Sequence, residues 1–542
     1  MANAQELRQE LAKLNKQLEE KNSIISNHEK IITEKDTLIK ELKEKVTLLE
    51  ILHFGPKSEK LTKEDERQAL LFDEAEDEAF RQADDAEDEN KTTETLEIAS
   101  HTRKVIRNQG RKPIAPDLPR EEIVYDIADD EKTCGCGHEM VCIGEEVNER
   151  VKIKPAEVKV LREIRKKYAC KHCEGTEDDR PGVVTAEGKK HLIGGSIADE
   201  SLLAWSISEK FEFSLPFYRQ TKRLEHIGVP IPRSTLCNLS VQTGDACKPL
   251  YHLLEEHIRS GPLINADETR VQVLKEPGRE ARDLSWMWVF AGGPPDKAAV
   301  LFKYDPSRSS DVPFEFLKGY SGWLQTDDYG AYHTAMKKLA EFSDRKCAPK
   351  HILCWSHARR KFVQAWEAEK TDHAKQGIDF IRELFALEDL RKEYSLKGFV
   401  KQRKNRAEEI FERFKPWLLR QFSETPPKGA LGKALAYTLD NWELLILYVE
   451  DGVLTPSNNR AENAIRPFVV GRKNWLFSGT PAGAEASAIH YSLIESAKLH
   501  KLNPYEYLYY LYSRLPFATS EEHYSRLLPF NLTPEQITGG KN

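Results

Sequence analysis

Residues 262–274, PLINADETRVQVL, begin the stretch of sequence that decides the fold of the main domain. Apolar residues dominate this stretch and polar residues interrupt it at short intervals, which is typical of a strand in a sheet. SWMWVFAGG (285–293) and AAVLFKYD (298–305) have the same character, and loops rich in Gly and Pro separate the three. We therefore predict three consecutive strands from residue 262 onward.

Helices and strands alternate after the third predicted strand. The expected elements are a short helix at about 311–318, a strand in GWLQTD (322–327), an amphipathic helix in YGAYHTAMKKLAEF (329–342), a strand in KHILCW (350–355) and a helix from about Ser356. This order is expected of the ribonuclease-H-like fold, a mixed sheet covered by helices. In that fold the first and fourth strands lie side by side.

Three carboxylates stand in separate elements of this pattern. Asp267 lies in the first strand, Asp327 ends the fourth, and Glu462 lies in PSNNRAENAIRP (456–467), a predicted helix. Two-metal phosphoryl transfer requires such an arrangement, because two magnesium ions about 4 Å apart must be held and neutralised together. We predict that Asp267, Asp327 and Glu462 are catalytic and bind two Mg²⁺ ions.

Each strand acid has an acidic neighbour, Glu268 after Asp267 and Asp328 after Asp327. Neighbouring residues of a regular strand point to opposite faces, so only one of each pair can serve the site. We choose Asp267 and Asp327 and keep Asp328 as the alternative second acid.

The span between Asp327 and Glu462 is far longer than one helix and its loop. Residues of about 365–450 are strongly helical in character and form a predicted all-helical insertion. A new helix then begins at Pro456-Ser457, and Asn458, Glu462 and Ile465 share one of its faces.

Basic residues follow two of these motifs. Arg359 and Arg360 come directly after Cys354-Trp-Ser-His357, while Arg466, Arg472 and Lys473 follow Glu462. Guanidinium and ammonium groups grip phosphates, so we predict that these five residues contact DNA. For the Cys354–His357 pair, a metal-binding role, an orienting role in the site and a packed strand-to-helix junction all stay open.

The region before the strands is predicted to contain several modules. Residues 1–55 carry a heptad repeat and are expected to form a coiled coil that joins copies of the chain into a homo-oligomer. Its main apolar row is Leu11, Leu18, Ile25, Ile32, Ile39 and Val46. Residues 56–130 hold an acidic linker and a basic segment, in which Arg111 and Lys112 are candidates for a DNA minor groove.

Two cysteine pairs predict a zinc ribbon at residues 131–178. Cys134 and Cys136 form the first pair, and Cys170 and Cys173 form the second, separated by a hairpin-length segment. Four such thiols suit one tetrahedral, structural Zn²⁺ ion. Because the first pair has only one residue between its members, Cys142, His138 or His172 remain alternative ligands.

Residues 186–260 are predicted to be helical. Within them a basic helix, a break at Gly228-Val-Pro230 and a capped helix from about Ser234 match a helix-turn-helix DNA reader, with Arg233 at the start of the second helix. An ordinary helical hairpin is the alternative. The catalytic domain is expected at 261–475 and a helical segment at 476–542.

Composition restricts the class of protein further. The chain has 542 residues, a net charge of −7 and nine cysteines, and no apolar run long enough to span a bilayer. We expect a multidomain α+β protein that is cytoplasmic.

Motifs along nearly the whole chain resemble the insertion-sequence-66 family of transposases. They are HFGPKSEK (53–60), the cysteine ribbon, LPFYRQ (215–220) with RSTL (233–236), ADET (266–269), LQTDDYGAY (324–332), CWSHARRKF (354–362), NNRAENAIRP (458–467), GRKNWLFSGT (471–480) and SLIESAKLHKLNPYEYL (492–508). The chain departs from similar proteins in the single residue between Cys134 and Cys136, and in Asp328, where a Gly is usual.

The resemblance implies a DDE transposase that binds the ends of its element as double-stranded DNA, and accessory proteins of the same element are possible partners. It also implies magnesium-dependent cleavage and strand transfer by Asp267, Asp327 and Glu462. Two rival functions stay open: a structure-specific nuclease of the same fold, which cuts but does not join, and a non-catalytic DNA-binding regulator.

Overall fold

The computed structural model describes residues 94–98, 101–105, 158–169, 183–342 and 348–538, together with Lys21 and Lys35. The predicted coiled coil, apart from those two lysines, lies outside the described residues. The same holds for two sets of predicted site residues: Arg111 and Lys112 of the basic segment, and Cys134, Cys136, Cys170 and Cys173 of the ribbon.

The chain divides into two compact units, one of residues 78–188 and one of residues 1–77 and 189–542. The first unit contains two antiparallel hairpins, β1 (Glu94–Ile98) with β2 (His101–Val105) and β3 (Lys167–Ala169) with β4 (Val183–Thr185). The β1–β2 hairpin is an element that the sequence did not predict.

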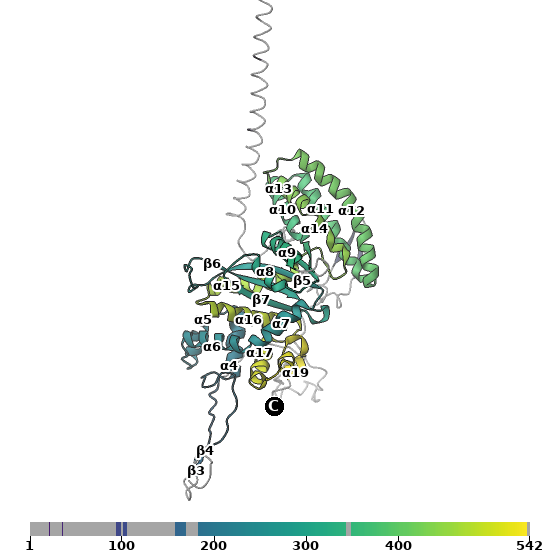
Figure 1. Cartoon of the computed structure of the whole chain (residues 1–542). Helices are drawn as coiled ribbons and strands as arrows, with labels where there is room; N and C mark the ends of the chain where they lie inside the picture. Colours follow the sequence, from purple (N-terminus) through teal and green to yellow (C-terminus); the bar gives the residue numbers. More distant parts are fainter. Residues whose placement is uncertain are drawn as a thin grey trace, which may run out of the picture. The chain divides into compact units, whose positions relative to one another are not determined.

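A five-stranded sheet is the centre of the larger unit (Figure 1). Its order is β7-β6-β5-β8-β9, and β6 (Leu284–Gly292) pairs antiparallel with both β5 (Leu263–Gln272) and β7 (Ala299–Asp305). β8 (Trp323–Thr326) pairs parallel with β5, and β9 (Lys350–Leu353) pairs parallel with β8. The predicted strands and the adjacency of the first and fourth are confirmed.

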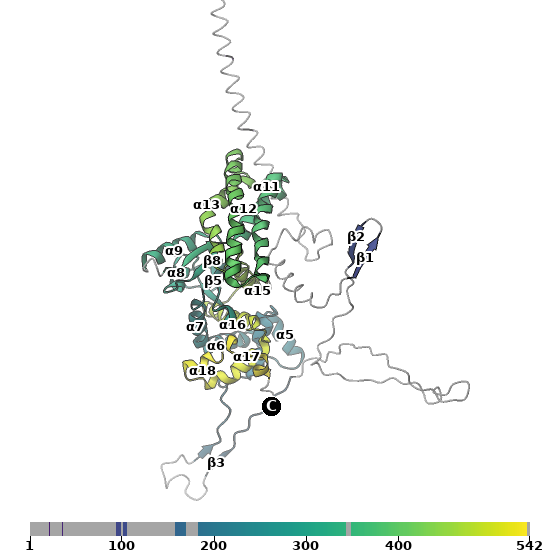
Figure 2. The same cartoon turned by 90° about the vertical axis from the view of Figure 1, so that its right-hand side faces the viewer.

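Helices cover both sides of this sheet. α8 (Asp311–Leu317) packs on α9 (Gly330–Phe342), and α16 (Pro481–Leu499) lies against β7, with the sheet between the two groups (Figures 1 and 2). The exposed edge of β7 is closed by two serines of α16. Ser492 Oγ accepts from Phe302 N at 2.8 Å and Ser496 Oγ accepts from Val300 N at 3.0 Å, so edge N–H groups have partners.

The predicted helical region and the C-terminal segment share one hydrophobic core with the sheet. α6 packs on α16, and α17 packs on α4. The boundaries predicted at residues 260 and 475 therefore lie inside a single core. The remaining helices of this core are α4 (Glu200–Phe211), α5 (Phe217–His226), α6 (Arg233–Ala246), α7 (Lys248–Arg259), α17 (Pro504–Arg514), α18 (Glu521–Ser525) and α19 (Pro534–Thr538).

The residues between β9 and α15 (Asn459–Trp475) are helical, as predicted, and pack around a second hydrophobic core that also includes Leu263 of β5 and Ile352 and Leu353 of β9 (Figure 2). Arg403 is fully buried there and donates to three carbonyl oxygens, of Leu454, Tyr448 and Asp451. The helices are α10 (Trp355–Glu369), α11 (Asp372–Ala386), α12 (Leu396–Glu424), α13 (Ala430–Asp440) and α14 (Trp442–Leu445), and the chain then returns through α15 (Asn459–Trp475). The short 3-10 helices of the larger unit are η3 (Pro295–Lys297), η4 (Leu387–Lys392), η5 (Ile446–Glu450), η6 (Leu515–Phe517) and η7 (Pro529–Asn531).

One predicted cap and one predicted helix start need correction. α6 begins at Arg233, next to the predicted start near Ser234, but no side chain caps it, so the predicted cap is wrong. α15 begins at Asn459, not at Pro456-Ser457, because Asn458 is the last residue with non-helical backbone angles. Among the described helices, none combines the length and apolar character that a membrane crossing requires.

We predict that Gly244→Ala destabilises the larger unit by about 1–3 kcal/mol, because the added methyl would meet the Cβ of Ala486 at 2.8 Å, where α6 crosses α16. Gly330→Ala is the matched control, since its added methyl has nothing within 4 Å. Thermal unfolding of both variants measures the difference. Equal unfolding temperatures would show that the two helices do not pack this closely.

Candidate active site

Asp267 and Asp327 lie at equivalent positions of the neighbouring strands β5 and β8. The last β5–β8 pair is Asn265 with Gln325, and Asp267 and Asp327 each follow two residues later. Adjacent strands are about 4.8 Å apart, so the backbone brings these two residues to the same point of the sheet. Asp267 lies within β5, and Asp327 comes directly after the last residue of β8.

The charges of the site interact strongly. Burial raises the pKa of Asp267 well above its ordinary value, and the carboxylates of Glu268, Asp327 and Glu462 raise it further. Burial, with Glu268 next, raises the pKa of Asp327 to about 6. The carboxylates of Asp327 and Glu462 therefore each lie close enough to Asp267 to disfavour its charged form. A divalent cation would relieve this repulsion, so the residues present fit a magnesium site.

Buried amides fix the position of Glu462 relative to β5. Asn458, directly before α15, donates from Nδ2 to Ala266 O at 2.9 Å and accepts at Oδ1 from Asn265 Nδ2 at the same distance. Asn265 also donates to Gln325 Oε1 at 3.0 Å, and Gln325 donates to Thr455 O at 2.8 Å. β5, β8 and the start of α15 are thus joined, with Glu462 one turn into the helix.

Glu268 is held by a separate set of contacts. Arg308 donates to its Oε1 from Nε at 3.0 Å and from a terminal nitrogen at 2.5 Å, and the Tyr332 hydroxyl donates to its Oε2 at 2.6 Å. The Arg308 guanidinium also lies 3.7 Å from the ring centroid of Tyr329. Because both its oxygens are engaged, Glu268 positions neighbouring groups, and the sequence did not predict this role.

The alternative acid Asp328 is turned to other partners. Its Oδ1 is 2.8 Å from His333 Nε2, and its Oδ2 accepts from Asn441 Nδ2 at 2.9 Å. Although burial opposes them, these hydrogen bonds and the charges of His333 and Lys361 lower the pKa of Asp328. This geometry favours Asp327 as the second acid. Asn441 lies between α13 and α14, so the helical insertion reaches the site here.

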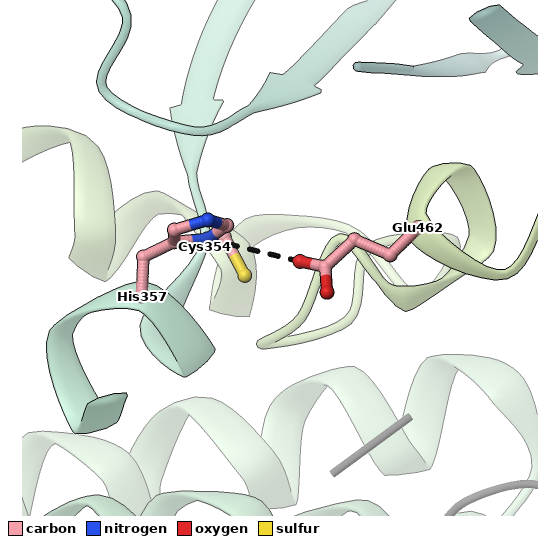
Figure 3. Close-up of side chains that lie close together, drawn as sticks. All are labelled: Cys354, His357 and Glu462. Carbon is pink, nitrogen blue, oxygen red and sulfur yellow. Dashed lines mark ion pairs between the residues drawn. The ribbon is translucent and has the colours of Figure 1, made fainter. Parts of the chain in front are cut away.

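Cys354, His357 and Glu462 form a further cluster, with one ligand atom of each within 4.8 Å of the others (Figure 3). The Cys354 Sγ accepts from Asn458 N at 3.1 Å, and burial raises the pKa of this thiol to about 12. His357 Nδ1 lies 3.8 Å from Glu462 Oε1, and burial lowers the pKa of His357 to about 4. Zinc accepts a thiol, an imidazole and a carboxylate, whereas magnesium prefers oxygen ligands and so, of these three groups, suits only the carboxylate. The cluster also connects the end of β9 with α15.

The predicted DNA-binding residues have different surroundings. Arg233 and Lys473 are exposed, and Arg359 and Arg466 are partly buried. Arg360 is exposed but lies 3.6 Å from Glu462 Oε2, so it is paired with a candidate catalytic acid.

Arg472 is also partly committed to the protein. It donates to Thr269 Oγ1 at 3.1 Å and to the carbonyl of Arg270, which attaches α15 to the outer half of β5.

Asn458→Ala should destabilise the protein by about 3 kcal/mol, because it removes two buried hydrogen bonds and leaves Asn265 and Ala266 O with fewer partners. Asn238→Ala, an exposed position on α6, is the control. Thermal unfolding measures both. An Asn458 variant as stable as the control would mean that the amide network does not hold α15 in place.

Two substitutions of acids should change stability in opposite directions in metal-free protein. Asp267→Asn should raise the unfolding temperature, because it removes a buried charge among like charges. Asp328→Asn should lower it, because the negative charge binds His333 and Asn441. Thermal unfolding at neutral pH in the presence of a chelator measures both, and shifts of the same sign would contradict this description of the site.

Models of one transposase family match most of the chain. Residues 195–486 match the family model described as "Transposase IS66 family", and residues 131–174 match the "zinc-finger binding domain of transposase IS66". Residues 41–123 match "Transposase C of IS166 homeodomain", and residues 492–530 match the "IS66 C-terminal element". The zinc-finger module predicted at 131–178 is confirmed at the level of the family.

Curated relatives come from Sinorhizobium fredii (strain NBRC 101917 / NGR234). The uncharacterized protein y4jD is 31% identical over 80% of this chain and 83% of its own length. The uncharacterized protein y4qI is 28% identical over 80% of each chain. No solved structure matches. Since one transposase family accounts for the central sheet, its helices and both flanking regions, the chain belongs to the IS66 family of transposases.

Proposed function

We propose that this chain is a DNA transposase that cleaves the ends of its insertion sequence and joins them to target DNA. The observation that carries the proposal is the convergence of Asp267, Asp327 and Glu462 from β5, the end of β8 and α15, with raised pKa values at both aspartates. The sheet order β7-β6-β5-β8-β9 supports a ribonuclease-H-like core.

Asp267, Asp327 and Glu462 would hold two Mg²⁺ ions. When bound, magnesium supplies Lewis-acid activation of the nucleophile and stabilisation of the leaving oxygen. The chain's own residues keep the site in shape: Arg308 and Tyr332 hold Glu268 beside Asp267, and His333 and Asn441 hold Asp328 away from it.

His357 and Arg360 would act on the third acid. The imidazole lies 3.8 Å from one oxygen of Glu462 and the guanidinium 3.6 Å from the other. Both groups approach the carboxylate from α10, so they restrict its rotation. When a cation binds the Glu462 carboxylate, Arg360 would be released from it and could bind a DNA phosphate, because a guanidinium pairs with either anion.

The remaining modules would bind DNA and join subunits. Exposed Arg233 at the start of α6 suits a groove-reading role, and Arg359, Arg466, Arg472 and Lys473 suit the DNA backbone near Glu462. Cys134, Cys136, Cys170 and Cys173 would bind one structural Zn²⁺ ion, and Arg111 and Lys112 would enter a minor groove. The coiled coil of residues 1–55 would pair two subunits so that one assembly processes both element ends.

We expect Asp267→Asn, Asp327→Asn and Glu462→Gln each to lower magnesium-dependent nicking of element-end DNA by about a thousandfold or more, because each removes a charged ligand from a shared site. Asp328→Asn is the control and should retain most activity. Gel assays of nicking, with mobility-shift assays of binding, separate catalysis from recognition. Full nicking by an Asp267 variant that still binds DNA would refute the triad.

Joining distinguishes transposition from plain cleavage. Purified protein is incubated with pre-cut element ends, a target plasmid and Mg²⁺, and joined products are mapped by sequencing. Strand transfer supports a transposase, cutting without joining supports the nuclease, and DNA binding with neither activity supports the regulator.

A further inference from the structure

Leu476 has an unusual backbone conformation directly after α15. Its φ is 67° and its ψ is −51°, and it is the only apolar side chain with positive φ among residues 183–342 and 348–538. Phe477 N donates to Trp475 O at 2.9 Å, which closes a three-residue γ-turn of the positive-φ type. This turn is rare because an L-side chain is strained there, by about 1–3 kcal/mol.

The strained turn presents apolar side chains to solvent. Leu476 is 63% exposed and Phe477 is 43% exposed. Glycine would adopt this backbone without strain, so the fold alone does not require leucine at the tip. A strained residue that also exposes apolar surface is typical of a contact site.

The turn is rigidly attached to the strand that carries Asp267. Ser478 N donates to Gln272 O at 2.9 Å, and Leu274 N donates to Ser478 O at 3.0 Å. Before the turn, Arg472 is bound to Thr269 and Arg270 of the same strand. Gln272 is five strand residues beyond Asp267, which is roughly 17 Å along β5.

The charge around the turn is suited to DNA. Arg270, Lys275 and Lys473 are exposed beside it. The carboxylates of the adjoining loop already have partners: Glu276 accepts from Tyr304 and Ser285, Glu280 pairs with Arg282 and Asp283 lies near Arg279. An apolar tip between cations matches the wedges that proteins insert between base pairs while cations hold the flanking phosphates.

We propose that Leu476 and Phe477 form a wedge that inserts between base pairs of the element-end duplex, about five base steps from the phosphodiester held at Asp267. The step count follows from roughly 17 Å of strand and about 3.4 Å per base step. The proposal rests on the proposed function for its DNA partner. Unstacking there would kink the duplex and loosen the base pairs between the wedge and the scissile phosphodiester.

Base unstacking is measured with 2-aminopurine, which fluoresces more strongly when unstacked. Full-length protein is mixed with duplexes taken from the terminal repeats that flank the coding sequence, in Ca²⁺ instead of Mg²⁺. Each duplex carries a single 2-aminopurine, and its position shifts by one base from one duplex to the next. We expect a several-fold fluorescence increase confined to one or two positions. The Leu476→Ala/Phe477→Ala variant should lose it, and the control Leu419→Ala/Phe517→Ala, which alters exposed apolar residues of α12 and η6, should keep it.

Leu476→Gly separates a wedge from a structural role. It should leave the unfolding temperature unchanged or raise it, because glycine relieves the strained φ, yet it should abolish the fluorescence increase. In Mg²⁺, a mismatch at the unstacked position should restore nicking by the double alanine variant.

Three results would overturn the wedge: no position unstacks with wild-type protein, the wedge variant unstacks as wild type does, or the control variant loses the signal equally. Wild-type unstacking without nicking in Mg²⁺ would leave the wedge standing and count against the proposed transposase activity alone.

Discussion

The hydrogen bonds of Asn458 are the constraint on which the site depends. This amide lies where α15 meets the sheet, donating to Ala266 O and accepting from Asn265 Nδ2. α15 begins after a long helical insertion, and Asn458 is 192 residues from Ala266 in the sequence. No local sequence pattern can hold this helix against such a distant strand, so the hydrogen bonds of Asn458 do so. A buried amide suits this task because leaving one of its hydrogen bonds unsatisfied costs about 1–3 kcal/mol. Any alternative placement of α15 against the sheet would break these bonds and is therefore unfavourable.

The carboxylates of the site repel one another, and hydrogen bonds from the surrounding fold partly offset this repulsion. Burial and three like charges, Glu268 among them, raise the pKa of Asp267. Glu268 and Asp328 already have hydrogen-bond partners in the protein, Arg308 and Tyr332 for Glu268, and His333 and Asn441 for Asp328. Asp267, Asp327 and Glu462 are the acids proposed to hold the cations. Arg308 contacts Tyr329, and both Arg308 and Tyr332 donate hydrogen bonds to Glu268. Residues at and near α9 therefore also fix the position of a charged group in the site.

The proposed catalytic elements and the proposed DNA-reading helices are not independent bodies. α4–α7, the sheet and α16–α17 share one core, and Ser492 and Ser496 of α16 bond directly to β7. DNA held at Arg233 of α6 would be placed relative to Asp267 by packed side chains rather than by a flexible linker. The γ-turn at Leu476 follows the same principle, because it joins α15 to α16 and is bonded to β5 on the way.

Sequence alone determined the five strands and the helical residues between β9 and α15, because apolar periodicity encodes these elements. The order of the elements predicted the adjacency of β5 and β8, which the sheet has. The assignment of Asp267, Asp327 and Glu462 as catalytic acids stays a proposal. The sequence left Asp327 and Asp328 undecided, since a strand's period shows that neighbours diverge but not which one meets Asp267. It also missed Arg308, Tyr332 and the pairing of Arg360 with Glu462. Only the tertiary structure showed these partners and the contact of Asp328 with Asn441, because they are contacts between residues far apart in the chain, and no local pattern records which distant group a buried charge will meet.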